Sequence, residues 1–349
     1  MRAPYRVRAD MARLGDERAV PSELDPGPAT VFRADRTWPT LVAERLDALE
    51  RHPGDVRALD PSADLDTLHA AGLAVARHAA KELPGRVQVD GDDVSLPLLA
   101  MRIDAAGAVH ALGGANPPAL GVAARARALA TLRDRPPQLR RLEAVVLALQ
   151  EDLVVIGTRH ASAFSGAAVG VAGRAADGAT STAASAAGAG RVAWLHVAFP
   201  SGWDPGAMAG ASFERLHAPV PDAHVLHRAA PALIEAMVTK GPFVRYVWGV
   251  SPDGARSRHP RHARPMRSDH GLEHGWLRVE RQTTLPLPEV GLALFAIGVH
   301  VTPLPEALPT PERREAFADA VASLTPAARR YKGVPWSDAL VRAWCAQVP

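Results

Sequence analysis

The stretch 276–304 reads as two long β-strands joined by a short connection, and it constrains the fold more than any other part of the chain. Side chains alternate in character along 276–285, and a period of two is typical of a β-strand. Pro286 and Gly291 then interrupt the alternation, as expected for a turn. Residues 292–301 are apolar and rich in β-branched side chains, which favours a second strand. The sequence therefore predicts a β-hairpin.

Arg281 is the unusual member of this hairpin. The alternation places it on the strand face of Leu277, Val279 and Leu285, so we expect it to point toward a core. A buried guanidinium needs an anionic partner, because an unpaired buried charge is very costly. The partner is either a protein carboxylate across the sheet or a bound anionic cofactor.

The composition is that of a large globular protein. The chain has 349 residues, of which 47% are hydrophobic, and this suffices for a large core in one or two domains. Net charge is only +3 and aromatic residues make up 5%, so a nucleic-acid surface is not indicated. No stretch approaches the roughly 20 apolar residues of a membrane span, and the N-terminus lacks the apolar segment of a signal peptide. We therefore expect a soluble cytoplasmic protein without nucleic-acid or membrane partners.

Cys345 is the only cysteine of the chain. It follows that there is no internal disulfide and no cysteine-ligated zinc or iron–sulfur site. If the reaction of this chain needs electrons, another polypeptide or a diffusible donor must deliver them.

The order of the predicted elements indicates the fold class. By periodicity, helices are expected at 38–51, 65–83, 122–132 and 139–150, short strands at 87–103, and a strand at 151–156. A strand at 191–199, a short helical stretch at 204–216, a longer helix at 228–239 and a strand at 243–250 precede the hairpin, and helices at 312–324 and 337–345 follow it. Two strands, short helices, one longer helix and three antiparallel strands are the plan of a PAS domain. The predicted class is α+β, with an antiparallel PAS-like sheet that wraps around one small ligand.

We expect three parts. Residues 1–145 form an N-terminal helical extension and arm that packs on the core, 146–305 form the PAS-like core, and 306–349 form C-terminal helices. Residues 161–190 consist largely of Ala, Gly, Ser and Thr. Such a segment buries too little apolar surface to offset its ordering entropy, so it is predicted to be a flexible insertion in the core.

Several motifs resemble the DUF3445 family, whose characterised type is the haem-binding α subunit of haem-dependent oxidative N-demethylase. The segments that carry the resemblance are Gln150-Glu151-Asp152-Leu153, Phe199-Pro200-Ser201 with Trp203, His217-Ala218-Pro219-Val220-Pro221, Arg258-His259-Pro260, and Leu277-Arg278-Val279-Glu280-Arg281-Gln282-Thr283 with Phe295 and Pro303-Leu304. The helix at 38–51, Val56 and Tyr331-Lys332-Gly333 also fit, so the resemblance spans nearly the whole chain.

The resemblance implies a PAS-like fold that holds haem b. The family's type enzyme activates O₂ and oxidises a small secondary amine to a primary amine and formaldehyde, with electrons from separate flavin and iron–sulfur subunits. We therefore expect a haem-dependent, O₂-activating monooxygenase of the oxidative N-demethylase type, acting on an amine or a related small molecule. Two alternatives stay open: a haem-binding PAS sensor of a diatomic gas, and a cofactor-free PAS-like partner subunit.

His217 is the expected axial ligand of the haem iron. Pro219 and Pro221 fix the chain just beyond it, and histidine is a common haem ligand. His224 and His227, at the entry to the longer helix, are rival ligands. The alternative for His217 is a capping or core histidine that is hydrogen-bonded to backbone.

Arg245, Arg281 and His259 are the candidate partners of the haem propionates. Charge-assisted pairing, which is often bidentate, suits the arginines. Arg245 and Arg281 equally fit an ion pair within the sheet, whereas a loop histidine such as His259 is more often solvated.

Four polar residues of the first hairpin strand are the candidate catalytic groups, namely Arg278, Glu280, Gln282 and Thr283. They are expected to polarise bound O₂ or to hold an amine, because a carboxylate near a cationic amine favours its charged form and positions it. A solvated ladder of cross-strand pairs explains the same pattern.

Four histidines in the loop 251–273 and just after it raise the question of a metal: His259, His262, His270 and His274. Zinc needs about four ligands in a tetrahedral array. The loop has no regular element to set that geometry, so the sequence favours solvated histidines.

The chain also departs from the family pattern at three places, which are Ala207-Met208-Ala209-Gly210, Val247-Trp248 and Gly298-Val299-His300. The last of these, at the end of the hairpin, is where we expect a change of substrate to show first.

Overall fold

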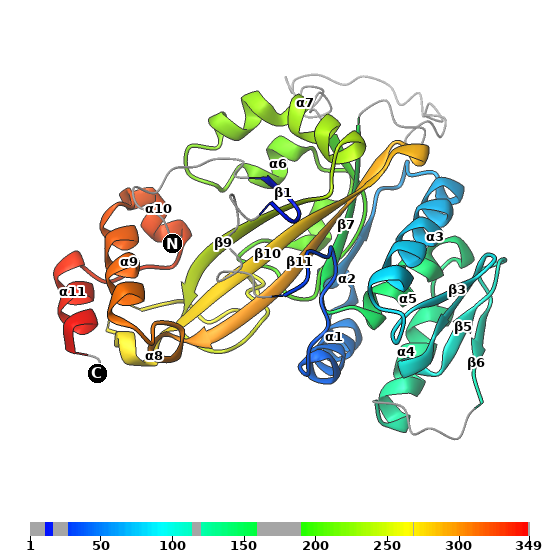
Figure 1. The fold of residues 1–349 in the computed structure, drawn as a ribbon, viewed down its shortest axis with the longest axis horizontal. Helices are drawn as coiled ribbons and strands as arrows, with labels where there is room; N and C mark the ends of the chain where they lie inside the picture. Colours follow the sequence, from blue (N-terminus) through cyan, green and yellow to red (C-terminus); the bar gives the residue numbers. More distant parts are fainter. Residues whose placement is uncertain (1–10, 17–26, 114–119, 159–189, 268, 348–349) are drawn as a thin grey trace, which may run out of the picture.

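A seven-stranded antiparallel sheet runs through the middle of the computed structural model, which describes residues 11–16, 27–113, 120–158, 190–267 and 269–347 (Figure 1). The strand order is β1-β9-β10-β11-β7-β8-β2. These strands are β1 (Ala12–Arg13), β2 (Arg57–Leu59), β7 (Asp152–Thr158), β8 (Gly190–His196), β9 (Phe243–Ser251), β10 (Trp276–Leu287) and β11 (Leu292–Pro303). The predicted α+β class with an antiparallel sheet is confirmed. Residues 161–189 of the expected insertion lie outside the described residues.

The hairpin that the alternation predicts is the centre of this sheet. β10 pairs with β11 in unbroken register, from Trp276 opposite Pro303 to Leu287 opposite Leu292. Both strands run two residues longer than predicted: Pro286 continues β10 instead of ending it, and Thr302 and Pro303 extend β11 opposite the start of β10. Gly291 closes the turn with φ of 66°, a left-handed conformation that glycine adopts without steric cost.

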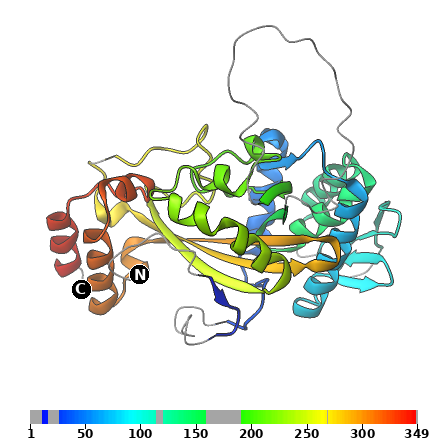
Figure 2. The ribbon, with the colours of Figure 1, turned by 90° about the horizontal axis from the view of Figure 1, so that it is seen from above.

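Helices α6 (Phe213–His217) and α7 (His224–Thr239) lie on one face of the sheet (Figure 2). The buried residues of α7 recur at helical spacing, as Leu226, Ala230, Ile234, Met237 and Val238. This helix begins four residues before the predicted start at 228. Its N-cap residue Ala223 provides no side-chain hydrogen bond, so no capping signal marks the start in the sequence.

The N-terminal part of the chain forms a helical layer and a second sheet at the turn end of the hairpin (Figure 1). Its helices are α1 (Trp38–Arg51), α2 (Pro53–Val56), α3 (Leu65–Glu82), α4 (Val122–Arg133) and α5 (Arg140–Ala148), and the second sheet is β3 (Gln88–Asp90), β4 (Asp93–Leu96), β5 (Met101–Ile103) and β6 (Val109–Ala111). Asp64 begins α3 by accepting a hydrogen bond from the Thr67 backbone N–H. Gly72 lets α3 approach α5 closely, because a Cβ there would lie 3.0 Å from the Cβ of Arg141.

The C-terminal helices lie at the opposite end of the long strands (Figure 1). They are α8 (Leu304–Ala307), α9 (Pro311–Ala322), α10 (Pro326–Tyr331) and α11 (Asp338–Gln347), of which α8 and α10 were not predicted. Their core includes Phe317, Val321, Trp336 and Val341. None of the helices in the described ranges combines the length and the apolar character that crossing a membrane requires.

Candidate functional site

A cavity of about 660 Å³ lies between the sheet and helices α6 and α7. One part of its wall is apolar, from Ile156, Phe213, Leu216, Met237 and Ile297. The other part is polar and comes from β9, β10, the loop at 258–266 and the chain at 329–335. This combination of a large apolar wall and a few converging polar groups is typical of a small-molecule or cofactor site.

The charges that line the cavity are strongly unbalanced. Cationic residues are Arg245, Arg258, Arg264, Arg278, Arg329, Arg330 and Lys332, whereas Glu280 is the one carboxylate among the described lining residues. Excess positive charge in a partly apolar cavity favours a ligand that carries negative charge.

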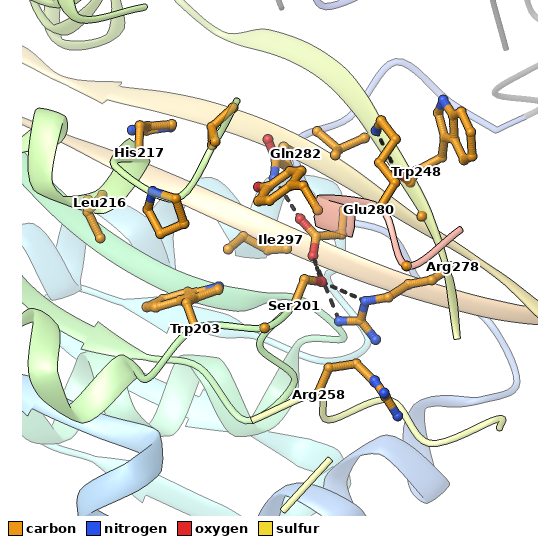
Figure 3. A pocket seen from close by; sticks show the side chains of 18 of the residues that line it. Ser201, Trp203, Leu216, His217, Trp248, Arg258, Arg278, Glu280, Gln282 and Ile297 are labelled. Atoms are coloured by element: carbon orange, nitrogen blue, oxygen red, sulfur yellow. Dashed lines mark hydrogen bonds and ion pairs between the residues drawn. The ribbon is translucent and has the colours of Figure 1, made fainter. Parts of the chain in front are cut away.

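Glu280 lies at the centre of a hydrogen-bonded network in this cavity (Figure 3). Its Oε1 accepts from the Ser201 hydroxyl, and its Oε2 accepts from Nε2 of Gln282 at 2.7 Å. Nε of Arg278 donates to the same Ser201 oxygen at 2.6 Å, and Nε of Arg245 donates to Oε1 of Gln282 at 2.7 Å. The network therefore links β9, β10 and the turn after β8 through a single buried carboxylate.

This face of β10 is not a solvated ladder. Arg278, Glu280 and Gln282 are each at most 9% exposed. Burial lowers the pKa of Arg278, yet its guanidinium is satisfied by Ser201 and by the carbonyl oxygen of Phe199 at 2.7 Å. The structure thus brings together three of the four predicted catalytic residues in the wall of the cavity.

Ser201 was not predicted as a site residue. The buried carboxylate of Asp152 sets its position by holding the backbone of the turn that contains it. Oδ2 of Asp152 accepts from the Phe199 backbone N–H at 2.8 Å, and its Oδ1 pairs with Arg45 at 3.2 Å. This clamp fixes the turn that carries Ser201 into the cavity. The Phe-Pro-Ser and Glu-Asp-Leu motifs contained the signal, because they supply the two halves of the clamp.

His217 contributes an imidazole to the apolar part of the cavity. Its Nδ1 donates to the carbonyl oxygen of Phe213 at 2.8 Å, and its ring stacks on the Phe213 ring with 4.0 Å between centroids. Burial in this wall lowers the pKa of His217 to about 4, and the nearby Arg245 acts in the same direction. The ring is therefore neutral at pH 7, and the proton on Nδ1 leaves the lone pair on Nε2.

The rival histidines, His224 and His227, lie in the first turn of α7, whereas His217 ends α6. His224 is exposed, and neither it nor His227 lines the cavity. His227 does have a buried Nε2 without a hydrogen-bond partner. Its imidazole nevertheless remains outside the cavity wall that His217 joins.

Lys332 is a second cavity residue that the sequence analysis missed. It is 4% exposed, its Nζ donates to the carbonyl oxygen of Trp248 at 2.7 Å, and it lies 4.6 Å from the centroid of the Trp248 ring. Burial lowers the pKa of Lys332 to about 8, although the Glu280 charge opposes this. The Tyr-Lys-Gly motif marked the position without indicating that the ammonium group is buried.

Arg281 and Thr283 point to the opposite face of β10 and do not line the cavity. The Arg281 guanidinium donates to the carbonyl oxygens of Thr30 at 2.6 Å and Val31 at 3.1 Å, and the Thr283 hydroxyl donates to Val31 at 2.9 Å. The expected partner of Arg281 was a carboxylate across the sheet or an anionic cofactor. In the structure these two residues hold the backbone of the N-terminal arm.

Two carboxylates complete this grip on the arm. Glu82 accepts from the backbone N–H groups of Val31 and Phe32, each at 2.9 Å, and Glu151 accepts from that of Arg33 at 2.8 Å. Burial raises the pKa of Glu151 to about 7. The arm is thus anchored through its backbone, and the side chains of Val31 and Phe32 are buried in the core as well.

His259 also lies away from the cavity. It is 2% exposed, so it is not a solvated loop residue, and its Nε2 is 3.2 Å from Oδ1 of Asp204. The neighbouring Arg258, by contrast, lines the cavity. Of the three expected propionate partners, only Arg245 lines the cavity.

The departures from the family pattern fall in two groups. Val247 and Trp248 line the cavity, whereas Met208 and the 298–300 segment do not. His300 is exposed. The end of the hairpin is therefore a poorer place to look for a change of substrate than the middle of β9.

A family model described as "Haem-dependent oxidative N-demethylase, alpha subunit-like" matches residues 24–341. Among curated proteins, no relative matches the chain. The family match covers every described residue that lines the cavity except Met11, the contacts that hold the arm, and the C-terminal helices up to the first turn of α11.

Proposed function

Because this chain belongs to the family of haem-dependent oxidative N-demethylase, alpha subunit-like proteins, we propose that its cavity holds haem b and that the chain is an O₂-activating oxidoreductase of small amines. The observation that carries this proposal is His217 in the apolar wall of the cavity. Its Nδ1 is engaged by the Phe213 carbonyl, which leaves Nε2 as a neutral donor of the kind that binds haem iron.

The lining of the cavity fits the rest of this cofactor. A volume of about 660 Å³ is within the range of cofactor sites. Ile156, Leu216 and Ile297 offer apolar contact to a porphyrin. The cationic residues offer partners for two propionates. Arg245 and Lys332 are the best placed of them: Arg245 donates to Gln282 in the central network, and Lys332 donates to the carbonyl oxygen of Trp248 in β9.

The strand order supports a PAS-like core over residues 146–305. Within the sheet, β9-β10-β11-β7-β8 are adjacent, and α6 and α7 connect β8 to β9 across one face. We retain 1–145 and 306–349 as parts that pack on this core. Strands β1 and β2 extend the sheet at its two edges, so the N-terminal part also contributes to it.

When bound, the haem supplies the activation of O₂. The residues of the chain then bind and orient the substrate. Glu280 is suited to hold a cationic amine, because a nearby carboxylate favours the charged form, and Ser201 and Gln282 fix the direction of its two oxygens. Arg278 holds Ser201 in turn and keeps the carboxylate from being an isolated buried charge.

A separate polypeptide is the proposed source of electrons. The family description names an alpha subunit, which suggests a partner or reductase. The single Cys345 leaves no ligand set for an iron–sulfur cluster in this chain. A flavin and iron–sulfur reductase is the partner class that we propose.

The test is turnover with a defined probe. Purified protein is incubated with haem, a secondary methylamine, O₂ and a flavin-dependent reductase, and formaldehyde and O₂ are measured. We expect formaldehyde to form in proportion to the O₂ consumed. Haem binding without turnover across a panel of methylated amines would contradict the demethylase assignment, and it would favour a gas sensor.

A further inference from the structure

A second cavity, of about 340 Å³, lies behind the loop that walls the first one. His52 follows α1 directly, and Asp55 lies in α2, the next turn of the chain. His259 and His262 come from the loop after β9, more than two hundred residues later. All four line this cavity, so the fold brings together two histidines that the sequence analysis assigned to solvent.

The ligand atoms form two groups of three, and each group is close enough to hold an ion. Oxygen or nitrogen atoms of His52, Asp55 and His262 lie within 4.8 Å of one another, and so do those of Asp55, Asp204 and His259. Asp55 belongs to both sets. The rings of His52 and His262 stack with 4.2 Å between centroids, and those of His259 and His262 with 5.1 Å.

An independent observation is the state of His259. This side chain is 2% exposed, and its Nε2 is buried without a hydrogen-bond partner. Oδ1 of Asp204, 3.2 Å away, also lacks an aligned hydrogen bond. A buried polar atom without an aligned hydrogen bond is costly, and these two complementary ligand atoms meet only as an ion pair outside hydrogen-bond geometry.

Arg261 supplies the positive charge that the two carboxylates of the cluster pair with in this structure. Its guanidinium pairs with Oδ1 of Asp55 at 2.8 Å and with Oδ2 of Asp204 at 2.7 Å. The arginine side chain is 59% exposed, so it can move into solvent. Its backbone N–H also donates to Nδ1 of His259 at 3.3 Å, and coordination through Nε2 would move the ring proton to Nδ1 and replace that contact.

We propose that His52, Asp55, Asp204, His259 and His262 form a binding site for a divalent transition-metal ion of the zinc class. Imidazole and carboxylate together suit zinc, whereas magnesium and calcium prefer ligand sets made of oxygen. Asp55 is the shared ligand, and the metal displaces Arg261 from it. This site is separate from the proposed haem cavity and does not depend on it.

The position of the site gives it a structural role. Arg258 precedes His259 in this loop. Its backbone N–H donates to the carbonyl oxygen of Pro200 at 2.8 Å, and its carbonyl oxygen accepts from the N–H of Gly202 at 3.1 Å, so the two bonds lie on either side of Ser201. A metal that ties His259 and His262 to Asp55 therefore fastens the loop against the turn that carries Ser201. The bound ion would hold this wall of the first cavity in place.

The test is zinc binding by the untagged full-length chain, measured by titration calorimetry and by metal content after desalting. We expect one zinc ion per chain. Asp55→Asn keeps the shape of the side chain and is expected to weaken binding by about tenfold or more. His274→Ala is the matched control, because His274 follows the same loop and its side chain is 72% exposed outside the cluster.

Arg261→Ala provides a second variant, at an exposed position where folding is not in question. It removes the competing cation, so zinc is expected to bind several-fold more tightly than to the wild type. Absence of stoichiometric zinc, equal binding by Asp55→Asn, or weaker binding by Arg261→Ala would overturn the site. The haem spectrum is recorded in the same samples, so failure of the metal site is distinguishable from failure of the haem assignment.

Discussion

Glu280 and Arg281 are neighbours in β10, but they serve opposite faces of the sheet. Glu280 accepts hydrogen bonds from Ser201 and Gln282 inside the large cavity. Arg281 donates to the carbonyl oxygens of Thr30 and Val31 on the other side. One strand therefore separates a site for a ligand from a site that anchors the N-terminal arm, and substitutions at the two positions are expected to have different consequences.

Glu280→Gln tests the ligand face. Glutamine preserves the shape of the side chain and an oxygen that accepts from Ser201, but it removes the negative charge. We expect kcat/KM for a cationic amine to fall about 10- to 100-fold, since a hydrogen bond to a charged group contributes about 1.5–3 kcal/mol. The haem absorbance should be unchanged. Loss of haem together with activity would contradict this separation of roles.

Arg281→Ala tests the anchoring face. It leaves the carbonyl oxygens of Thr30 and Val31 without their buried donor, so the free energy of unfolding is expected to fall by about 2–4 kcal/mol. Urea denaturation measures this change. Haem bound per folded chain should equal that of the wild type. A variant of wild-type stability that no longer retains haem would show that Arg281 belongs to the cofactor site after all.

The raised pKa of Glu151 leads us to expect that the free energy of unfolding depends on pH. Burial raises its folded-state pKa from the ordinary 4.5 to about 7. The folded protein then binds the proton more tightly than the unfolded chain, so this group lowers stability as the pH rises from about 4.5 to about 7. The contribution is on the order of 3 kcal/mol, because one pKa unit corresponds to about 1.4 kcal/mol.

Glu151→Gln removes this titration while an amide oxygen still accepts from Arg33. Compared with the variant, the wild type should lose stability between pH 5 and pH 7.5, and the variant should be the more stable protein at pH 8. Urea denaturation of both proteins across this pH range measures the difference. A constant difference across the range would show that Glu151 is already ionised at pH 5.

Lys332→Met tests the charge of the cavity. The substitution keeps an unbranched side chain over the Trp248 ring but removes the ammonium group. We expect haem affinity to fall by about tenfold, as one charge-assisted contact of the cavity is lost. Lys332→Arg should retain most of the affinity. Equal haem dissociation rates for the wild type and Lys332→Met would exclude Lys332 as a propionate partner.

Local pattern predicts the elements better than it predicts their partners. The alternation at 276–285 and the apolar run at 292–301 predict the central hairpin, because a period of two directly reflects the strand geometry. The helix at 38–51 has its predicted bounds. The start of α7 was wrong by four residues, since neither a cap nor a break in the apolar pattern marks it.

The contacts of the site depend on separations that a single sequence does not encode locally. Arg281 meets Thr30 across a separation of 251 residues, and the pattern around Arg281 predicts a buried charge without indicating that backbone carbonyls accept its hydrogen bonds. His262 meets Asp55 across 207 residues in the same way. The period-two rule correctly grouped Arg278, Glu280 and Gln282 on one face, but it did not indicate whether that face met solvent or a cavity.

The absorption spectrum of purified His217→Ala tests the central claim most directly. Wild-type protein reconstituted with haem is expected to show a Soret band at one haem per chain, and His217→Ala is expected to lose it. His224→Ala and His227→Ala, the matched histidine controls on α7, should retain the band. A full Soret band in His217→Ala, with its loss in His224→Ala or His227→Ala, would contradict the assignment of His217 as the haem ligand.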